Sequence, residues 1–170
     1  MVRRPHVPTQ TLTLPSVLDR LLDDNPGEPQ RDAALYFDLS DFKAALARDL
    51  EALLNTRVVE HDLFMNYPMA AKSVIRFGIP DLSSLSLLSP DDRERLRGEV
   101  EWAIERFEPR LTHVKVTLNV PDKAGAVLLE RMLHFRVDAF LKIHPRRPPV
   151  SFDATLQLSS NAYQVRGRGH

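Results

Sequence analysis

The hydrophobic pattern of this chain changes from helical to alternating at Pro109, and this change restricts the folds that the chain can adopt. Apolar residues recur at helical spacing from Leu96 to Phe107. Proline disfavours helical backbone at the residue before it, here Glu108, and it has no N–H with which to continue a helix. We therefore expect a helix that ends near Phe107 and a strand that begins directly after the proline.

Three runs after this junction alternate between apolar and polar residues, at positions 114–120, 133–143 and 150–158. Phe140 is the one exception to the alternation. The turn formers at 159–161 predict a last short strand over 163–166. Alternation gives each strand one buried and one wetter face, which is typical of an antiparallel sheet.

Helical patterns precede the strands. Helices are predicted from Ser16 to Leu22, from about Asp41 to Leu54 and from Pro90 to Phe107, the last with Ser89 as its N-cap. Residues 58–88 contain several helix breakers but stay apolar, and we expect an extended stretch packed over the core. The predicted fold class is α+β, with N-terminal helices followed by a helix and an antiparallel β-meander in a single domain.

Length and composition exclude several classes of protein. The chain has 170 residues, with 23 basic and 23 acidic side chains, so it lacks the basic excess of a nucleic-acid-binding protein. It has no cysteine, which excludes disulfides and cysteine zinc sites and fits a cytoplasmic protein. The sequence contains no run of 18 apolar residues, so no membrane-spanning helix is expected. The predicted organisation is a mobile arm over 1–15, one domain over 16–166 and a tail over 167–170.

Catalytic and metal sites find little support among the residues. Glu101 and Glu105 lie four apart on one predicted helix and would point the same way, without the second wall that a glycosidase cleft needs. Arg97 lies four residues before Glu101, which favours an ion-paired, solvated helix face. His113 and His134 are expected on the polar faces of strands, and no histidine spacing matches a metal motif. We predict no catalytic residue, no metal and no cofactor.

Glu108 and Arg110 flank Pro109 at the stiff end of the helix, and two interpretations stay open for them. They can form a local ion pair, which contributes about 0–1 kcal/mol when exposed. Alternatively, they reach a partner, where a desolvated charge pair of fixed geometry contributes more. Residue chemistry alone favours the first interpretation.

Four segments together resemble one known family, TssE, the type VI secretion baseplate protein related to the small wedge protein of contractile phage tails. The segments are Ser16–Leu22, Arg48–Arg57, Phe77–Leu82 and Phe107–Leu111. They occur in the family's order, and the resemblance extends over about residues 16–166. The last segment contains the glutamate–proline–arginine motif that is the family's hallmark.

The resemblance implies a structural baseplate wedge subunit that is not an enzyme. Glu108, Pro109 and Arg110 would then contact the wedge core bundle, which is built from TssF and TssG. The implied partners also include TssK, the sheath proteins TssB and TssC, and the inner tube and spike, at the inner face of the cell envelope. The subunit would start sheath polymerisation by offering a sheet edge to the first sheath strands. The residues expected at that edge are Phe152, Ala154, Leu156, Tyr163 and Val165. The alternative is a peptidoglycan-cleaving glycosidase with Glu108 as general acid.

Overall fold

The computed structural model describes residues 16–21, 39–58, 66–70, 73–81, 85–86, 89–119, 132–143 and 147–168. Contacts group the chain into two compact units, Met1–Ala45 and Leu46–His170, and the boundary between them lies within helix α2 (Leu39–Asn55). The predicted arm at 1–15 and the last two residues of the predicted tail lie outside the described residues.

The first unit contains the short helix α1 (Val17–Leu21), which begins one residue after the predicted start. Ser16 and Asp19 form a reciprocal cap at its N-terminus. The Asp19 carboxylate accepts from the Ser16 N–H at 2.9 Å, and the Asp19 N–H donates to the Ser16 Oγ at 3.1 Å. This arrangement satisfies backbone donors that the helix itself leaves unpaired.

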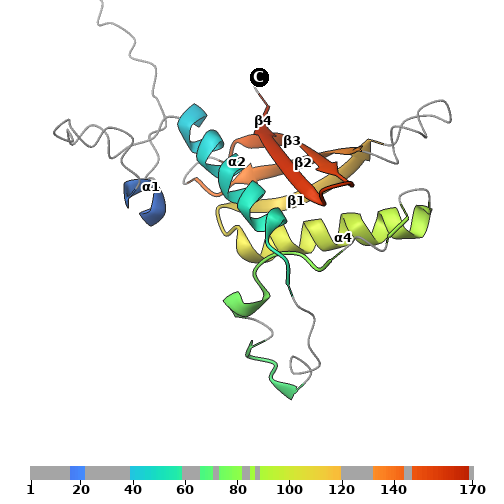
Figure 1. Ribbon diagram of the computed structural model, residues 1–170. Helices are drawn as coiled ribbons and strands as arrows, with labels where there is room; N and C mark the ends of the chain where they lie inside the picture. Colours follow the sequence, from blue (N-terminus) through green and yellow to red (C-terminus); the bar gives the residue numbers. More distant parts are fainter. Residues whose placement is uncertain are drawn as a thin grey trace, which may run out of the picture. The chain divides into compact units, whose positions relative to one another are not determined.

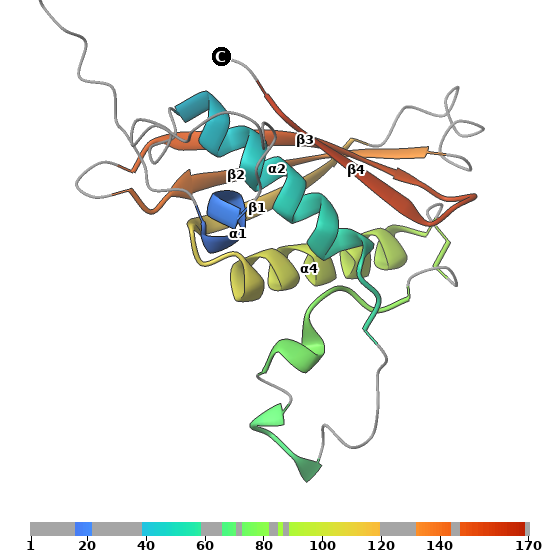
Figure 2. The same cartoon turned by 60° about the vertical axis from the view of Figure 1, so that its left-hand side comes forward.

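The second unit is built on a four-stranded antiparallel sheet in the order β1-β2-β3-β4 (Figures 1 and 2). The strands are β1 (Leu111–Asn119), β2 (Met132–Leu141), β3 (Pro149–Gln157) and β4 (Ala162–Gly167). Neighbours in sequence are neighbours in the sheet, so the predicted meander is confirmed. Phe140 keeps the alternation after all, because it lies on the outer face of β2 and is 43% exposed.

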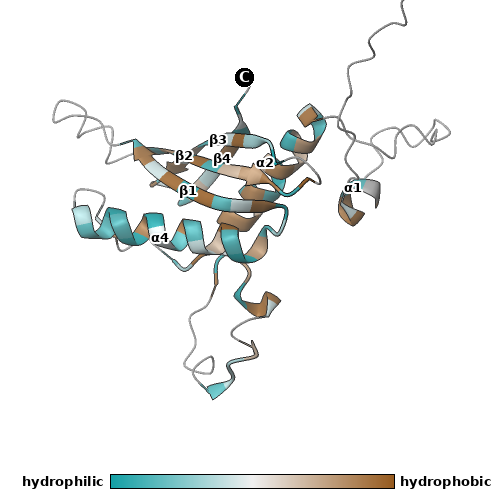
Figure 3. Cartoon of the chain, turned by 180° about the vertical axis from the view of Figure 1, so that it is seen from behind, coloured by the Kyte–Doolittle hydropathy of each residue, from teal (hydrophilic) through white to brown (hydrophobic). Residues whose placement is uncertain are grey.

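Helix α4 (Pro90–Phe107) confirms the predicted helix and its cap, since the Ser89 side chain accepts from the Asp92 N–H. The helix buries four side chains at helical spacing: Leu96, Val100, Ala103 and Ile104. It runs alongside β1, while much of its surface is hydrophilic (Figures 1 and 3). Because helix and strand are joined directly at the proline, α4 and β1 form one antiparallel helix–strand unit.

The C-terminal half of α2 contributes a second row of buried apolar side chains to this unit, at Leu46, Leu50, Leu53 and Leu54. Their spacing of three or four residues places them along one face of the helix. The helix begins at Leu39, two residues before its predicted start at about Asp41. Helices packed with an antiparallel sheet confirm the α+β class.

The segment between α2 and α4 differs in part from the extended stretch that we predicted. It contains the 3₁₀ helix η3 (Val74–Arg76), and its residues Val74 and Ile75 are 77% and 64% exposed, so these two do not pack over the core. Ile79 is buried and forms an isolated parallel bridge with Arg57. Gly78, directly before this bridge, has a φ of +118°. Its backbone lies against the backbone of Thr56, the residue that follows α2.

Strand β1 contains an irregularity that affects the predicted histidine positions. The register with β2 shifts between Thr112 and Lys115, and His113 there has a φ of +53°. A bulge of this kind bends and twists an edge strand. His113 and His134 are both exposed, and His134 lies opposite Asn119. None of the described helices is long and apolar enough to cross a membrane.

Candidate partner-binding junction

The junction between α4 and β1 is a closed turn. The Glu108 N–H donates to the Ile104 carbonyl at 2.9 Å and thereby completes the last turn of α4. The Leu111 N–H then donates to the Glu108 carbonyl at 3.1 Å and starts β1. Pro109, between them, needs no hydrogen-bond acceptor. The backbone of the motif is therefore fixed on both sides.

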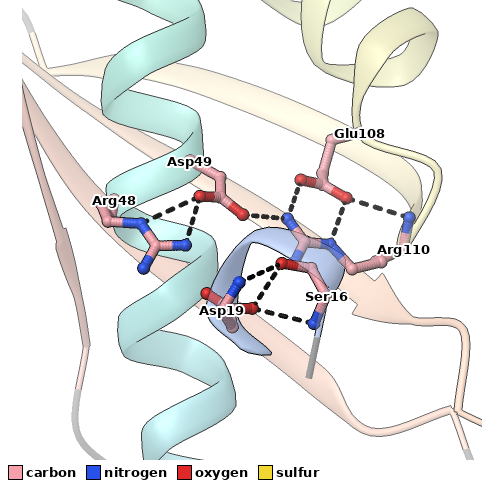
Figure 4. Close-up of polar contacts among 6 residues, drawn as sticks. All are labelled: Ser16, Asp19, Arg48, Asp49, Glu108 and Arg110. Carbon is pink, nitrogen blue, oxygen red and sulfur yellow. Dashed lines mark hydrogen bonds and ion pairs between the residues drawn. The ribbon is translucent and has the colours of Figure 1, made fainter. Parts of the chain in front are cut away.

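The side chains of Glu108 and Arg110 bind each other at short range (Figure 4). The Arg110 Nε donates to one Glu108 oxygen at 2.7 Å, and a terminal guanidinium nitrogen donates to the other at 2.5 Å. The Arg110 backbone N–H adds a third bond, to the first oxygen, at 3.1 Å. Glu108 is only 5% exposed and is the one charged residue buried among those that the structure describes. This fork geometry is the strongest form of arginine–carboxylate pairing.

Asp49, on α2, extends the pair into a network. A terminal nitrogen of Arg110 donates to Asp49 at 2.6 Å, and Arg48 donates to the other Asp49 oxygen at 2.8 Å and 3.1 Å (Figure 4). Burial alone would lower the pKa of Arg110, but its hydrogen bonds to Glu108 and Asp49 outweigh burial and raise that pKa above its ordinary value. Arg110 thus stays charged and ties the α4–β1 turn to α2.

This geometry shows the local ion pair of the first interpretation, while partner contact stays a prediction. Glu108 does act in a local ion pair, but its carboxylate is buried and Arg110 also binds Asp49 on α2, so the pair is not a weak surface bridge. The parts of the network that meet solvent are Pro109, which is exposed, and the side chains of Arg48, Asp49 and Arg110, at 44%, 22% and 24% exposure. A partner that reached this junction would touch those groups and not Glu108.

The residues predicted at a sheet edge fall into two groups. Phe152, Ala154 and Leu156 lie on β3, which pairs with β2 on one side and β4 on the other. These three residues lie on an inner strand, because the predicted last strand, observed at 162–167, pairs outside them, and contact of these strands with the sheath stays a prediction. All three are at most 2% exposed. Tyr163 and Val165 do lie on the edge strand β4, although their side chains are buried in the core.

The outer side of β4 is already bound by side chains of α2. Asn55 accepts from the Tyr163 N–H and donates to the Tyr163 carbonyl, both at 2.9 Å. Glu51 accepts from the Val165 N–H at 2.9 Å, and Arg57 donates to the Asn161 carbonyl. The amide of Asn55 supplies the same donor and acceptor that a residue of a neighbouring strand would supply.

At the other edge, β1, one side-chain bond to the outward backbone occurs among the described residues. Glu101 of α4 accepts from the Val116 N–H at 2.8 Å, and its second oxygen pairs with Arg97 at 2.5 Å. The predicted ion pair between Arg97 and Glu101 is thereby confirmed, but Glu101 also has a structural role on the strand. No cluster of three or more potential metal ligands occurs in the part of the chain that is described.

Comparison with known proteins identifies the family. The family model for the baseplate wedge protein gp25 matches residues 40–146, which is more than half of the 170-residue chain. The chain belongs to the gp25 baseplate wedge family. The family is a structural component of phage-tail-like baseplates. No curated protein and no solved structure matches the chain.

The matched region of this gp25-family chain contains the described bonds of Arg110 to Asp49 and Glu108, and Pro109 between the two motif residues. Sequence reasoning named Glu108 and Arg110 but missed Asp49, Glu51 and Asn55 as bonded groups. Glu51 and Asn55 are four residues apart and share one side of α2, whereas Asp49 lies two residues before Glu51 and therefore on another side of the helix, so no single periodic pattern in the sequence marks all three. Their strand partners lie 61 to 114 residues away.

Proposed function

We propose that this chain is the TssE-type wedge subunit of a type VI secretion baseplate, located at the inner face of the cell envelope. In this role it binds the wedge core bundle of TssF and TssG and starts polymerisation of the TssB–TssC sheath. TssK, the inner tube and the spike are further neighbours in the same assembly. The family match over residues 40–146 is the observation that carries the proposal.

The junction geometry supports a binding role. The buried Glu108–Arg110 pair and Asp49 hold the turn in one conformation, so its exposed groups are presented without an ordering cost on binding. Pro109 adds a rigid apolar contact, and Arg48 adds an exposed charge beside it. We therefore assign partner contact to Pro109, Arg48 and the exposed side of Arg110, with Glu108 as the group that positions Arg110.

A glycosidase finds no favouring observation at this site. A general acid has to be within hydrogen-bond reach of a substrate oxygen. Glu108 is 5% exposed and both of its oxygens are bound to Arg110. The carboxylate therefore faces its own arginine, and the proposed function is structural.

Co-purification with co-expressed TssF and TssG tests the proposed contact. We expect Arg48→Glu to reduce capture at least fivefold, because it reverses an exposed charge at the junction, and rim charges govern association. The matched control is Arg95→Glu, on the exposed side of α4 away from the junction. Equal capture of wild type and Arg48→Glu would contradict the junction as the contact. No capture of the wild type would contradict the proposed function itself.

Pro109→Ala is expected to reduce capture less than Arg48→Glu, because the bonds of Glu108 to Ile104, Leu111 and Arg110 remain. A loss from Pro109→Ala larger than the loss from the charge reversal would contradict this ranking. Thermal unfolding of each variant shows whether it is folded before capture is compared.

A further inference from the structure

The two faces of the sheet differ in composition. Side chains alternate between the faces along each strand. The inner face carries the buried apolar side chains, and the opposite face, which we call the outer face, carries mostly polar side chains that are exposed or half-buried. The charged residues of the outer face are Lys115, Arg136, Asp138, Asp153, Arg166 and, directly after β4, Arg168.

Three arginines surround one carboxylate on the outer face. Asp153 lies opposite Arg136 on β2 and opposite Arg166 on β4. Its carboxylate is 3.7 Å from Arg136 and 3.9 Å from Arg168, and both distances are too long for a hydrogen bond. Within the described part of the chain, Arg166 has no ion-pair partner. One carboxylate cannot neutralise three guanidinium groups, so positive charge remains on this part of the face.

Lys115, on β1, adds a fourth positive charge to the outer face. It lies opposite Asp138 in the register, but that carboxylate accepts a hydrogen bond from the Ser151 hydroxyl at 2.5 Å. No ion pair joins Lys115 to Asp138 or to another carboxylate among the described residues. The outer face thus has four basic and two acidic side chains, whereas the whole chain has 23 of each. The excess of positive charge is a local property of this face.

The charges of the outer face indicate the chemistry of its partner. The positive excess favours an acidic partner, because complementary potentials steer association and fix orientation. A phosphate backbone fits poorly, since Asp138 and Asp153 lie on the two middle strands and would meet its phosphates with like charge. An acidic protein surface can place carboxylates at the cations and neutral or basic groups at these two positions.

The composition of the outer face also favours a contact that can be released. Among the described residues, the exposed large apolar side chains of this face are Met132 and Phe140, near the two ends of β2. Permanent interfaces are more apolar than transient ones, and contacts between exposed charges weaken as salt is added. Under the proposed function, the inner tube moves past the baseplate when the sheath contracts, so its contact with the baseplate has to be released.

We propose that the outer face of the sheet docks an acidic patch of the inner tube, with Lys115, Arg136 and Arg166 as its main contacts. The identity of the partner rests on the proposed function. The acidic chemistry of the patch rests on the charges of the face alone. The outer face shares no residue with the junction around Arg110, so one subunit can bind the wedge bundle and the tube at the same time.

Binding of the full-length chain to purified inner-tube protein tests the proposal. We expect binding at about 50 mM salt that weakens about tenfold at about 300 mM salt, because salt screens exposed charges. Lys115→Glu and Arg166→Glu should each weaken binding about fivefold at low salt. The control Arg95→Glu reverses an exposed charge on α4 and should leave binding unchanged. Binding that does not depend on salt, or equal effects of the control and the two outer-face variants, would overturn the proposal.

A variant that binds more tightly separates the charge of the face from damage to the fold. Asp153→Asn removes one of the two carboxylates of the outer face and should strengthen tube binding about threefold at low salt. The matched control is Asp91→Asn, which removes an exposed carboxylate of α4 and should have no effect. Weaker binding by Asp153→Asn would overturn the proposal.

Capture by co-expressed TssF and TssG distinguishes failure of this inference from failure of the proposed function. Lys115→Glu and Arg166→Glu lie outside the junction and should be captured like the wild type. Capture of the wild type without binding to the tube protein would overturn the inference and retain the wedge role. No capture of the wild type would contradict the proposed function itself. Binding to vesicles with about 30% phosphatidylglycerol, lost in Arg166→Glu and without binding to the tube, would identify a lipid surface and overturn the inference.

Discussion

Removal of the Arg110 guanidinium is expected to destabilise the fold far more than loss of an ordinary surface charge. Arg110→Met retains most of the side-chain volume but leaves the Glu108 carboxylate, at 5% exposure, with no cation beside it. Breaking a buried ion pair by removing one partner costs about 3–5 kcal/mol. Because the Arg110 side chain is 24% exposed, water can reach part of the site, and we expect about 3 kcal/mol.

The double variant Glu108→Gln/Arg110→Met isolates the interaction between the two side chains. It removes the uncompensated charge, so its cost should be smaller than that of Arg110→Met alone, at about 1–2 kcal/mol. The single variant Glu108→Gln leaves Arg110 with Asp49 and partial access to solvent, and should lie between the two. The order of the three costs is thus a property of the buried pair.

Urea unfolding followed by circular dichroism measures these costs at 25 °C. With a denaturant slope of about 2 kcal/mol/M, a loss of 3 kcal/mol lowers the unfolding midpoint by about 1.5 M. The matched control, Arg95→Met, removes an exposed arginine of α4 and should change the free energy of unfolding by less than about 0.5 kcal/mol. A cost below 1 kcal/mol for Arg110→Met, or additive costs in the double variant, would refute the role of a buried clamp.

Three further predictions concern other parts of the second unit. Gly78→Ala should destabilise it by about 3 kcal/mol or more, because φ is +118° and an added Cβ would lie 2.3 Å from the Thr56 carbonyl oxygen. Gly98→Ala, on α4 where an added Cβ would have nothing within 4 Å, should instead stabilise it by about 1 kcal/mol. Thermal unfolding of both variants measures the two effects, and the opposite order would contradict the close approach at Gly78. Burial raises the pKa of Tyr163 to about 12, so the native state keeps this proton after the unfolded chain has lost it, and the free energy of unfolding should fall by about 1.4 kcal/mol per pH unit from pH 10 up to pH 12. Tyr163→Phe should lose this part of the alkaline sensitivity in urea titrations at pH 9 and pH 11, and an unchanged slope would contradict the assignment. Glu51→Ala/Asn55→Ala should accelerate hydrogen exchange at Tyr163 and Val165 at least tenfold while the amides of β2 stay protected; unchanged exchange at β4 would mean that the α2 side chains do not protect it.

Local patterns were sufficient to predict the parts of the fold that local physics determines. The alternation over 133–143 and 150–158 predicted β2 and β3, and the serine–proline start predicted α4, because the period of burial and the capping of a helix are properties of nearby residues. The bulge at His113 was not predictable, since nothing in its neighbours requires a positive φ. The exposure of Val74 and Ile75 was also not predictable, because an apolar side chain alone does not indicate whether another part of the chain covers it.

The sequence predicted only those contacts of the candidate site that join residues close together in the chain. Glu108 and Arg110 lie two residues apart, so their pairing follows from the chain, but Asp49 joins them from 61 residues away. The order of the strands is a second example. The sequence predicts strands over 150–158 and 163–166, but only the observed pairing shows that β4 lies outside β3 and makes β3 an inner strand. Hydrogen bonds between distant backbone groups leave no periodic signal in the sequence.

The bonds from α2 to β4 set an order for folding. Glu51 and Asn55 meet Val165 and Tyr163 across 114 and 108 residues of chain. During synthesis, α2 leaves the ribosome long before the strand that its polar side chains bind, so these side chains stay hydrated until the last segment is made. Closing a loop of that length carries a large entropic cost and slows folding. The edge strand is therefore expected to dock last, and a nascent chain that stops before residue 162 would expose β3 as an unprotected edge.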